Sequence, residues 1–218
     1  MFTGITTIFF DLDNTLINRD AAFLACLEHF FGENMPDYYF GNEQFEIEKK
    51  DQHGYTTRAH FCEWFIHHYQ PKGWDETNFW NYIKTNISNF VPPISIQLKA
   101  KLLHLQKNYK IGILTNGSII NQSRKIRQAK LDAIVPTEAI YIAQQFQLSK
   151  PNKRLFELIL EQEGISANQM LYIGDDPVND VLGAAQVGIQ TAWVSHKRAW
   201  TSSIKPDFIL ENIFHLPI

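Results

Sequence analysis

Cysteine is scarce in this sequence, because Cys26 and Cys62 are the only two among 218 residues. Two thiols can form at most one bridge, so a framework of several disulfides is excluded. The first residues, MFTGITTIFFDLD, carry no basic segment, and their apolar run is too short for a secretion signal. We therefore expect reduced, buried thiols and a cytoplasmic location.

The sequence also lacks a long apolar run and an excess of basic residues. No stretch of about 18 apolar residues occurs, so no membrane span is expected. The formal net charge of −3 and the isoelectric point of about 6.2 argue against a nucleic-acid polymer or an anionic membrane as partner. A hydrophobic content of 44% suits a globular chain with a substantial core. An oligomer is compatible with the sequence, but nothing in it indicates one.

The first part of the chain changes character twice. Residues 6–10 form a short apolar, β-prone run that predicts a buried strand. From about residue 20 to residue 90, apolar and aromatic residues recur with a helical period, and GENMP, DQHGY and QPKGW supply turns. This pattern predicts a bundle of about four helices. The VPPI segment at residues 91–94 then predicts a stiff connector.

Strand and helix patterns alternate in the remainder of the chain. Expected helices cover residues 94–107, 118–129, the segment from Pro151 to Gly164, and 178–187, and expected strands are KIGILT, AIVP, MLYIG, QTAWV and DFIL. This alternation predicts a parallel sheet covered on both faces. The expected fold class is α/β, with a Rossmann-like parallel sheet core formed by residues 1–16 and 92–218. Residues 17–91 would form an inserted α-helical domain.

Small polar and acidic residues follow three of the expected strands. They are Asp11 and Asp13 after the first, Thr115, Asn116 and Gly117 after the second, and Asp175, Asp176 and Asp180 after MLYIG. Ligands of an open parallel sheet bind at the carboxyl ends of its strands, so these residues should meet at one edge. One such aspartate alone would suit a turn or a helix cap. Five carboxylates together need a cation, and oxygen ligands near a phosphate suit Mg²⁺.

Two further segments are suited to bind an anion. In LTNGS, Thr115 and a glycine precede Ser118, the expected N-cap of a helix whose amides favour a phosphate group. In LSKPNKRLF, Lys150 stands directly before Pro151 and the next helix. A lone lysine is usually a solvated surface residue, but this place in the topology makes Lys150 a candidate counter-charge for a phosphoryl group.

These segments resemble the four sequence motifs of the haloacid dehalogenase superfamily. DLDNTL is similar to the first motif, LTNGS to the second, SKP to the third and GDDPVND to the fourth, in the family's order from residue 9 to about residue 188. The two middle motifs are weak alone, whereas the first and the fourth together are specific. The helical segment after the first motif resembles the cap of the subgroup with α-helical caps.

The resemblance implies a Mg²⁺-dependent phosphatase that acts on a small phosphomonoester, such as a nucleotide or a sugar phosphate. Asp11 would be the nucleophile and would form an aspartyl-phosphate. Asp13 would protonate the leaving oxygen and later deprotonate water. The metal ligands would be the Asp11 side chain, the Asp13 backbone carbonyl and Asp175, while Asp180 would order metal-bound water or Lys150.

The resemblance also implies which residues would bind the phosphoryl group. Thr115, the Asn116 amide and Lys150 would hold its oxygens in the transition state, with Gly117 in the same loop. Many relatives carry a small polar residue in place of Asp176, whose role stays open.

Asp13 separates the alternatives within the family. Dehalogenases lack this second aspartate because a leaving halide needs no proton, and phosphonatases replace it with a small residue. Phosphomutases keep both aspartates, so the first motif does not exclude a mutase. A non-catalytic phosphate- or metal-binding regulatory module is a further alternative, which the complete acidic set disfavours.

Contacts with the rest of the substrate are expected from turns and loops. The candidates are His53, Tyr55 and Arg58 in DQHGYTTR, Asn18 and Arg19 near the entry to the helical domain, and Lys197 and Arg198 in WVSHKRAW. Arg58 suits an exposed helix position equally well. The WVSHKRAW pair could attract an anionic substrate or simply lie on the surface.

Overall fold

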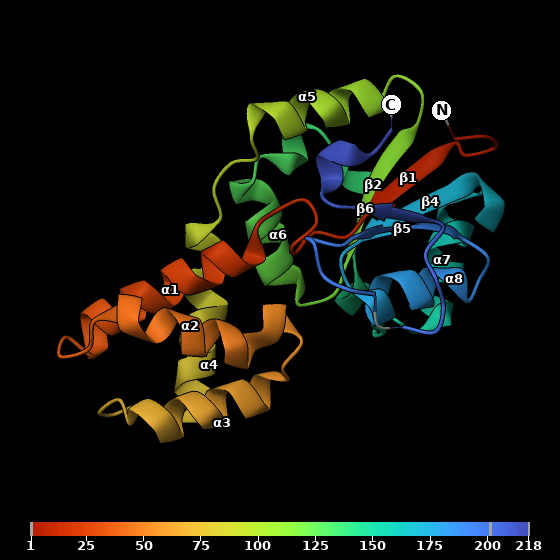
Figure 1. The fold of residues 1–218 in the computed structure, drawn as a ribbon. Helices are drawn as coiled ribbons and strands as arrows, with labels where there is room; N and C mark the ends of the chain where they lie inside the picture. Colours follow the sequence, from red (N-terminus) through yellow and green to blue (C-terminus); the bar gives the residue numbers. More distant parts are fainter. Residues whose placement is uncertain (1, 201, 218) are drawn as a thin grey trace. The chain divides into compact units, whose positions relative to one another are not determined.

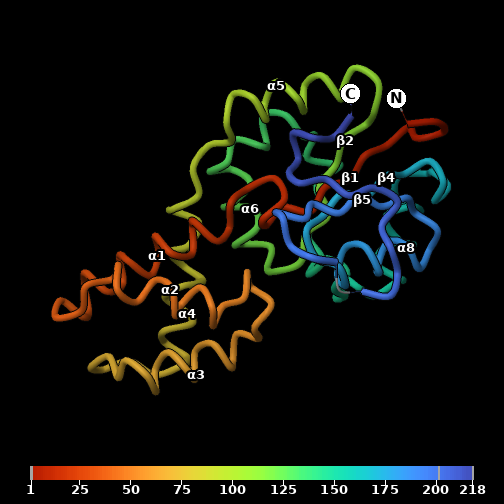
Figure 2. The backbone as a smooth tube through the Cα atoms, viewed as in Figure 1, coloured from red at the N-terminus to blue at the C-terminus, as the bar shows by residue number. Residues whose placement is uncertain are grey.

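The computed structural model describes residues 2–200 and 202–217, and the chain divides into two compact units. The core unit comprises Met1–Ile17 and Pro93–Ile218, and the helical unit comprises Asn18–Pro92. Figure 2 follows the chain out of the core unit after its first strand and back at Pro93. The helical unit is therefore one continuous insertion into the core.

A six-stranded parallel sheet forms the centre of the core unit (Figure 1), in the order β3-β2-β1-β4-β5-β6. The strands are β1 (Thr7–Phe10), β2 (Lys110–Thr115), β3 (Ile140–Ile142), β4 (Met170–Gly174), β5 (Gln190–Val194) and β6 (Phe208–Leu210). The strands β1 and β4 are buried along their whole length, as continuous apolar runs require when helices cover both faces. The predicted α/β, Rossmann-like fold class is confirmed.

Helices cover the two faces of the sheet (Figure 1). They are α5 (Ile96–Leu105) and α6 (Ile119–Gln128) on one side, and α7 (Lys153–Glu163) and α8 (Gly183–Ala185) on the other. On the α7 side, the rings of Phe156 and Tyr172 meet edge to face with centroids 5.3 Å apart. As predicted, Ser118 is the N-cap of α6 and Gly164 ends α7 in a left-handed conformation.

Short helical turns complete the core unit. They are the 3₁₀ turns Leu131–Ala133, Thr137–Ala139, Ala143–Phe146, Ala167–Gln169 and Ile213–His215, and the π-helix Pro177–Leu182. The helix predicted over residues 178–187 therefore begins with a widened turn, in which the Asp176 carbonyl accepts hydrogen bonds from the amides of Asp180 (3.1 Å) and Val181 (3.3 Å). Such π turns frequently mark functional sites in proteins.

The strand predicted at AIVP is wrong. The amides of Ile134 and Val135 donate to the Leu131 carbonyl at 2.9 and 2.8 Å, so they form a helical turn and cannot join a ladder. The strand at this place is β3, which pairs with residues 113–115 of β2. Both segments are short apolar runs, and only the tertiary structure selects the one that reaches the edge of β2.

The helical unit consists of four α-helices, as the periodicity predicts. They are α1 (Arg19–Asn34), α2 (Phe40–Asp51), α3 (Arg58–Tyr69) and α4 (Glu76–Asn86), with 3₁₀ turns at Gln52–Gly54 and Ile87–Phe90. Aromatic rings fill the centre, where Phe65 and Phe79 stack with centroids 4.0 Å apart and Phe30 meets both edge to face. Throughout the described residues, every helix is too short or too polar to cross a lipid bilayer.

The two cysteines lie in the helical unit as free, buried thiols. Burial raises the pKa of Cys26 to about 12. Burial, assisted by the charge of Glu76 and opposed by Arg58, raises the pKa of Cys62 to about 11. At pH 8 both side chains are therefore protonated thiols rather than the reactive thiolate.

We expect the folded protein to resist thiol reagents. At pH 8, 5,5′-dithiobis(2-nitrobenzoate) should label neither Cys26 nor Cys62 within minutes, because both thiols are protonated and shielded from solvent. In guanidinium chloride both should react at once, which serves as the control. Rapid labelling of the folded protein, followed by absorbance at the thiolate product band, would contradict the buried placement.

Candidate active site

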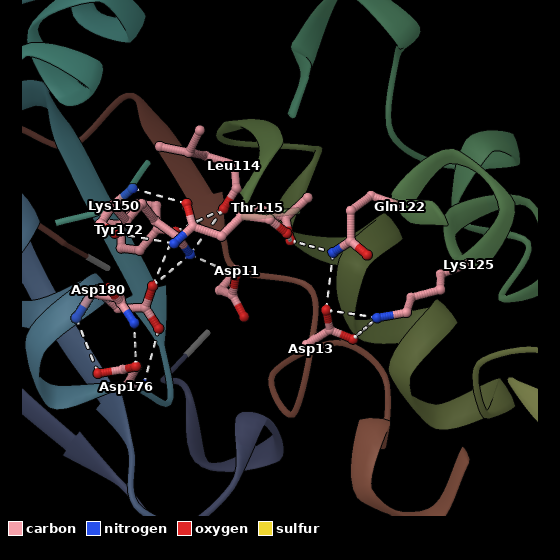
Figure 3. Close-up of polar contacts among 12 residues, drawn as sticks. Asp11, Asp13, Leu114, Thr115, Gln122, Lys125, Lys150, Tyr172, Asp176 and Asp180 are labelled. Atoms are coloured by element: carbon pink, nitrogen blue, oxygen red, sulfur yellow. Dashed lines mark hydrogen bonds and ion pairs between the residues drawn. The ribbon is translucent and has the colours of Figure 1, made fainter. Parts of the chain in front are cut away.

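The carboxyl ends of three neighbouring strands bring the predicted polar residues together. Phe10 of β1 is in register with Ile113 of β2 and with Ile173 of β4, so the residues that follow lie at one level. The Asp11 amide donates to the Ile173 carbonyl at 2.8 Å and extends this pairing into the loop. The site therefore forms beside the central strand, at the edge where open parallel sheets bind ligands (Figure 3).

A tight turn after β1 presents both aspartates of the first motif. The Leu12 carbonyl accepts hydrogen bonds from the amides of Leu16 and Ile17, each at 3.0 Å, and Asn14 has a positive φ of 56°. Leu12 itself is fully buried. An apolar residue that anchors the turn between two polar ones leaves Asp11 and Asp13 available to the site.

Lys150 is the internal cation of this site. Its Nζ donates to Asp11 Oδ1 at 2.6 Å, to Asp180 Oδ1 at 2.6 Å and to the Tyr172 hydroxyl at 2.9 Å (Figure 3). The side chain is only 3% exposed. Asp180 can approach because residue 174 is glycine: a Cβ at Gly174 would lie 2.2 Å from Asp180 Oδ2. Lys150 therefore joins the ends of β1 and β4 through a charged, buried contact.

Three buried carboxylates converge at this edge of the sheet. Asp11, Asp175 and Asp180 each offer an oxygen, and these oxygens lie within 4.8 Å of one another. A donor set of carboxylate oxygens alone fits a hard divalent cation such as Mg²⁺. The Asp13 side chain contacts side chains of α6 (Figure 3), and metal binding by the Asp13 backbone carbonyl stays a prediction.

Burial, together with repulsion between neighbouring carboxylates, raises the pKa values of two members of this cluster. Burial, with added repulsion from Asp180 and Asp13, raises the pKa of Asp11 to about 7 although Lys150 opposes the shift. Burial and the charges of Asp180 and Asp11 also raise the pKa of Asp175 well above its usual value, against the opposing effect of Arg198. A site with this excess of negative charge favours a bound cation.

The pKa of Lys150 is also raised, which favours the charged form of this side chain. Burial alone would lower its pKa, but the charges of Asp11 and Asp180 outweigh burial and raise the pKa well above its usual value. Lys150 is therefore charged, and it is a structural partner of the acidic residues as well as a candidate for phosphoryl binding. The hydroxyl of Tyr172, which donates to the Leu114 carbonyl at 2.8 Å, holds the ammonium group from a third side.

Asp13 has its own, separate set of partners. Lys125 Nζ donates to both carboxylate oxygens, at 2.7 and 2.9 Å, and Gln122 Nε2 donates to Oδ2 at 2.9 Å. The same Gln122 amide donates to Thr115 Oγ1 at 2.7 Å. Because Lys125 pairs with Asp13 and Lys150 pairs with Asp11, two carboxylates only two residues apart each have a cation.

Sequence reasoning missed Gln122 and Lys125. A signal exists: once Ser118 is taken as the N-cap of α6, these residues are three apart and share a helix face with Ile126. Two polar residues on an otherwise buried face indicate a polar partner. The missing information was which aspartate that face would meet.

The loop after β2 is tied to the loop that carries Lys150. The Asn116 side chain accepts from the Lys150 amide at 2.8 Å and donates to the Lys150 carbonyl at 3.1 Å. Gly117 has a φ of 120°, and a Cβ there would lie 3.2 Å from the Gln122 side chain. The structure therefore brings Thr115, Asn116 and Lys150 together, with Gly117 in the tight turn that leads into α6.

Two residues near β4 have clear structural roles. Asp176 caps the π-helix, because its Oδ1 accepts hydrogen bonds from the amides of Val178 (2.8 Å) and Asn179 (3.0 Å). Arg198 donates to the Asp175 carbonyl at 2.9 Å and to Asp175 Oδ2 at 3.2 Å. The role left open for Asp176 is thus a helix cap, and Arg198 orients an acidic residue of the site.

The other basic candidate in this loop and the candidates of the helical unit have local partners. Lys197 is 80% exposed along its side chain and pairs with Glu211 at 3.3 Å. The Arg58 guanidinium lies 4.5 Å from the centre of the Trp80 ring. Other contacts within the helical unit are Asn18 with the Ala21 amide, Arg19 with Asp51, and His53 with Asp20.

One of the turn candidates, His53, lines a pocket inside the helical unit. Its volume is about 380 Å³, and Asp20, Phe23, Phe45, Asp51 and His53 are among the residues that line it. Tyr55, in the same turn, is 41% exposed. Substrate binding by Arg58 and a cap function of this unit stay predictions.

Comparison with known proteins gives a consistent result. The sequence model of the haloacid dehalogenase-like hydrolases matches residues 8–194, from β1 to the end of β5. Pyrimidine 5′-nucleotidase YjjG of Escherichia coli is 29% identical over 223 residues, which cover 96% of this chain and 95% of that protein. Glyceraldehyde 3-phosphate phosphatase of Pyrococcus furiosus is 27% identical over 202 residues, which cover 88% of this chain and 81% of that protein.

Solved structures share the fold. The crystal structure of the HAD-hydrolase YfnB from Bacillus subtilis, bound to magnesium, matches with a TM-score of 0.77 and 20% identity over 96% of this chain and 95% of that one. A 2-haloacid dehalogenase from Pseudomonas syringae matches with a TM-score of 0.62 and 23% identity, covering 98% and 96% of the two chains. Solved structures with this fold include a dehalogenase and a HAD phosphatase from Thermococcus onnurineus, so the fold does not distinguish between the two chemistries.

Proposed function

This chain belongs to the haloacid dehalogenase-like hydrolases, and we propose that it is a Mg²⁺-dependent phosphatase that hydrolyses a small phosphomonoester through an aspartyl-phosphate on Asp11. One observation carries the proposal. Asp13 is present two residues after Asp11 and is held by separate partners, Gln122 and Lys125. A second carboxylate with its own environment can move a proton while the first one attacks. A halide leaving group would not need that proton.

In the first step, Asp11 attacks the phosphorus atom. Lys150 donates to Oδ1, so the other oxygen, Oδ2, forms the new bond to phosphorus. The bond between phosphorus and the ester oxygen breaks, its electron pair goes to that oxygen, and Asp13, which enters this step in its protonated form, supplies the proton. Thr115 and Lys150 would stabilise the charge on the phosphoryl oxygens.

In the second step, water attacks the phosphorus of the aspartyl-phosphate. Asp13 accepts a proton from that water, the bond between phosphorus and Asp11 breaks, and inorganic phosphate leaves. Both aspartates return to their starting state. The same Asp13 side chain thus acts first as an acid and then as a base. From one position it must reach both the ester oxygen and the water that later attacks the phosphorus.

The acidic cluster would hold the cation. Asp11, Asp175 and Asp180 supply the oxygens, and Arg198 and the Trp193 indole (2.8 Å) hold the Asp175 carbonyl in place. When bound, Mg²⁺ would offset the negative charge of the carboxylates and of the substrate phosphate. Lys150 keeps Asp11 in position for metal binding and for attack on phosphorus, and it keeps Asp180 in position for metal binding.

The relatives support a proposal for the substrate class. One relative is a pyrimidine 5′-nucleotidase and another is a glyceraldehyde 3-phosphate phosphatase. We therefore propose that the substrate is a small phosphorylated metabolite, with nucleoside monophosphates and small sugar phosphates as the first compounds to test. A panel that contains uridine 5′-monophosphate, thymidine 5′-monophosphate and glyceraldehyde 3-phosphate would rank these classes.

Removal of the metal tests the proposal directly. Purified protein with Mg²⁺ should release p-nitrophenol from p-nitrophenyl phosphate, and EDTA should lower that rate by about 100-fold or more because three clustered carboxylates then lack their cation. Excess Mg²⁺ should restore the rate, whereas excess Na⁺ at the same ionic strength should not. A rate that EDTA leaves unchanged would contradict the metal requirement, and inactivity towards every phosphomonoester would contradict the phosphatase function.

A further inference from the structure

The buried face of α6 carries two polar side chains that have no assigned role in the two chemical steps above. Gln122 is 2% exposed and Lys125 is 7% exposed, and with Ile126 they are the buried residues of the helix. Burial of an amide and of an ammonium group is unfavourable unless both find hydrogen-bond partners. Helix packing needs neither group, so their presence calls for a separate explanation.

Both side chains meet at Asp13. Lys125 Nζ contacts both carboxylate oxygens, at 2.7 and 2.9 Å, and therefore fixes the plane of the carboxylate as well as its position. Gln122 Nε2 lies 2.9 Å from Asp13 Oδ2 and 2.7 Å from Thr115 Oγ1. One amide nitrogen thus joins the proposed proton carrier to a proposed ligand of the phosphoryl group (Figure 3).

We propose that Gln122 and Lys125 are positioning residues for proton transfer by Asp13, an inference that rests on the phosphatase function proposed above. Lys125 holds the Asp13 carboxylate on the α6 side, away from the Lys150 cluster that contains Asp11. Gln122 fixes the separation between this carboxylate and Thr115. The two residues together keep the proton carrier apart from the nucleophile and in register with the phosphoryl site.

The chemistry makes this separation important. The oxygen that receives the proton is bonded directly to the phosphorus, so its place is set by the groups that hold the phosphoryl group. A proton carrier that is linked to one of those groups stays in line with that oxygen, and a displacement of about 1 Å is enough to lower a rate by about 100-fold. The loss should be largest for substrates whose leaving oxygen most needs a proton.

The test compares two aryl phosphates. The leaving group of phenyl phosphate is a basic phenoxide that requires protonation, whereas the leaving group of p-nitrophenyl phosphate is a stabilised phenolate. In Lys125→Met and in Gln122→Leu, kcat/KM for phenyl phosphate should fall by about 100-fold, and kcat/KM for p-nitrophenyl phosphate by about 10-fold or less. The parameter kcat/KM is used because it reports the first phosphoryl transfer, in which the leaving group departs.

Two further variants make the comparison specific. Arg124→Met changes a cationic residue on the exposed side of the same helix and should leave both values within about twofold of wild type. Lys125→Arg keeps a cation that can pair with both oxygens, and it should recover most of the activity on phenyl phosphate. Thermal unfolding of each variant verifies that the core is folded.

The outcomes separate the two proposals. Equal losses for both substrates, or no loss in folded Lys125→Met and Gln122→Leu, would overturn the positioning role while the phosphatase function stands. Failure of the Lys125→Arg rescue together with equal losses would assign Lys125 to stability alone. Wild-type protein that hydrolyses neither aryl phosphate would overturn the proposed function and this inference together.

Discussion

Replacement of Asp11 by asparagine should lower phosphatase activity by about 10⁴-fold or more. The carboxamide has nearly the same shape as the carboxylate, but it is not a nucleophile towards phosphorus. Its oxygen can still accept the hydrogen bond that Lys150 donates to Asp11 at 2.6 Å, so the fold of the core should be retained. The loss therefore reports chemistry rather than unfolding.

The measurement of Asp11→Asn has two parts. Phosphate release from p-nitrophenyl phosphate gives the rate, and mass spectrometry of acid-quenched samples should detect a phosphorylated chain for wild type and none for the variant. Asp132→Asn, at an exposed position of a 3₁₀ turn, is a matched control that should keep full activity. Retention of more than about 1% of the wild-type rate by Asp11→Asn would exclude Asp11 as the nucleophile.

Replacement of Lys150 by methionine should strongly destabilise the core unit. Lys150 contacts Asp11 and Asp180, each at 2.6 Å, and is 3% exposed. Without this cation, buried carboxylates face one another with no partner for their charge, which typically costs about 3–5 kcal/mol of unfolding free energy. Activity should be lost as well, because Lys150 also holds the nucleophile and is placed to bind the phosphoryl group.

Urea unfolding monitored by tryptophan fluorescence can measure this effect. Lys153→Met, at an exposed position at the start of α7, is the control and should change the unfolding free energy by less than about 0.5 kcal/mol. Mg²⁺ should recover part of the stability lost in Lys150→Met, because it neutralises the same carboxylates. A variant within about 1 kcal/mol of wild type would show that Lys150 is not the internal cation of the cluster.

The acidic positions could be anticipated because their signal is local. Asp11, Asp175 and Asp180 follow apolar strands within a few residues, and parallel strands place their carboxyl ends at one edge. The strand and helix patterns that carry them are also local, so most elements of the fold were predicted. The exceptions are AIVP and the widened turn at Pro177–Leu182, where neighbouring elements rather than sequence periodicity determine the backbone.

The partners of these acidic residues could not be anticipated in the same way. Lys125 of α6 contacts Asp13, and Arg198 of the loop after β5 contacts Asp175. Tyr172 of β4 contacts Lys150, the cation of the acidic cluster. Sequence reasoning gave Arg198 a different interpretation, either substrate attraction or surface exposure. A charged residue in a sequence does not indicate which opposite charge it will meet, because that depends on how helices and loops pack on the sheet.

The sequence by itself determined that two aspartates follow the first strand, that an acidic loop follows β4, and that a helical segment separates the first motif from the second. These features depend on hydrophobic periodicity and on residues near one another in the chain. Only the tertiary structure decided that Asp11 pairs with Lys150 and that Asp13 pairs with Lys125 and Gln122. The reason is physical: buried charges must be paired in space, and those pairs join residues more than 100 positions apart.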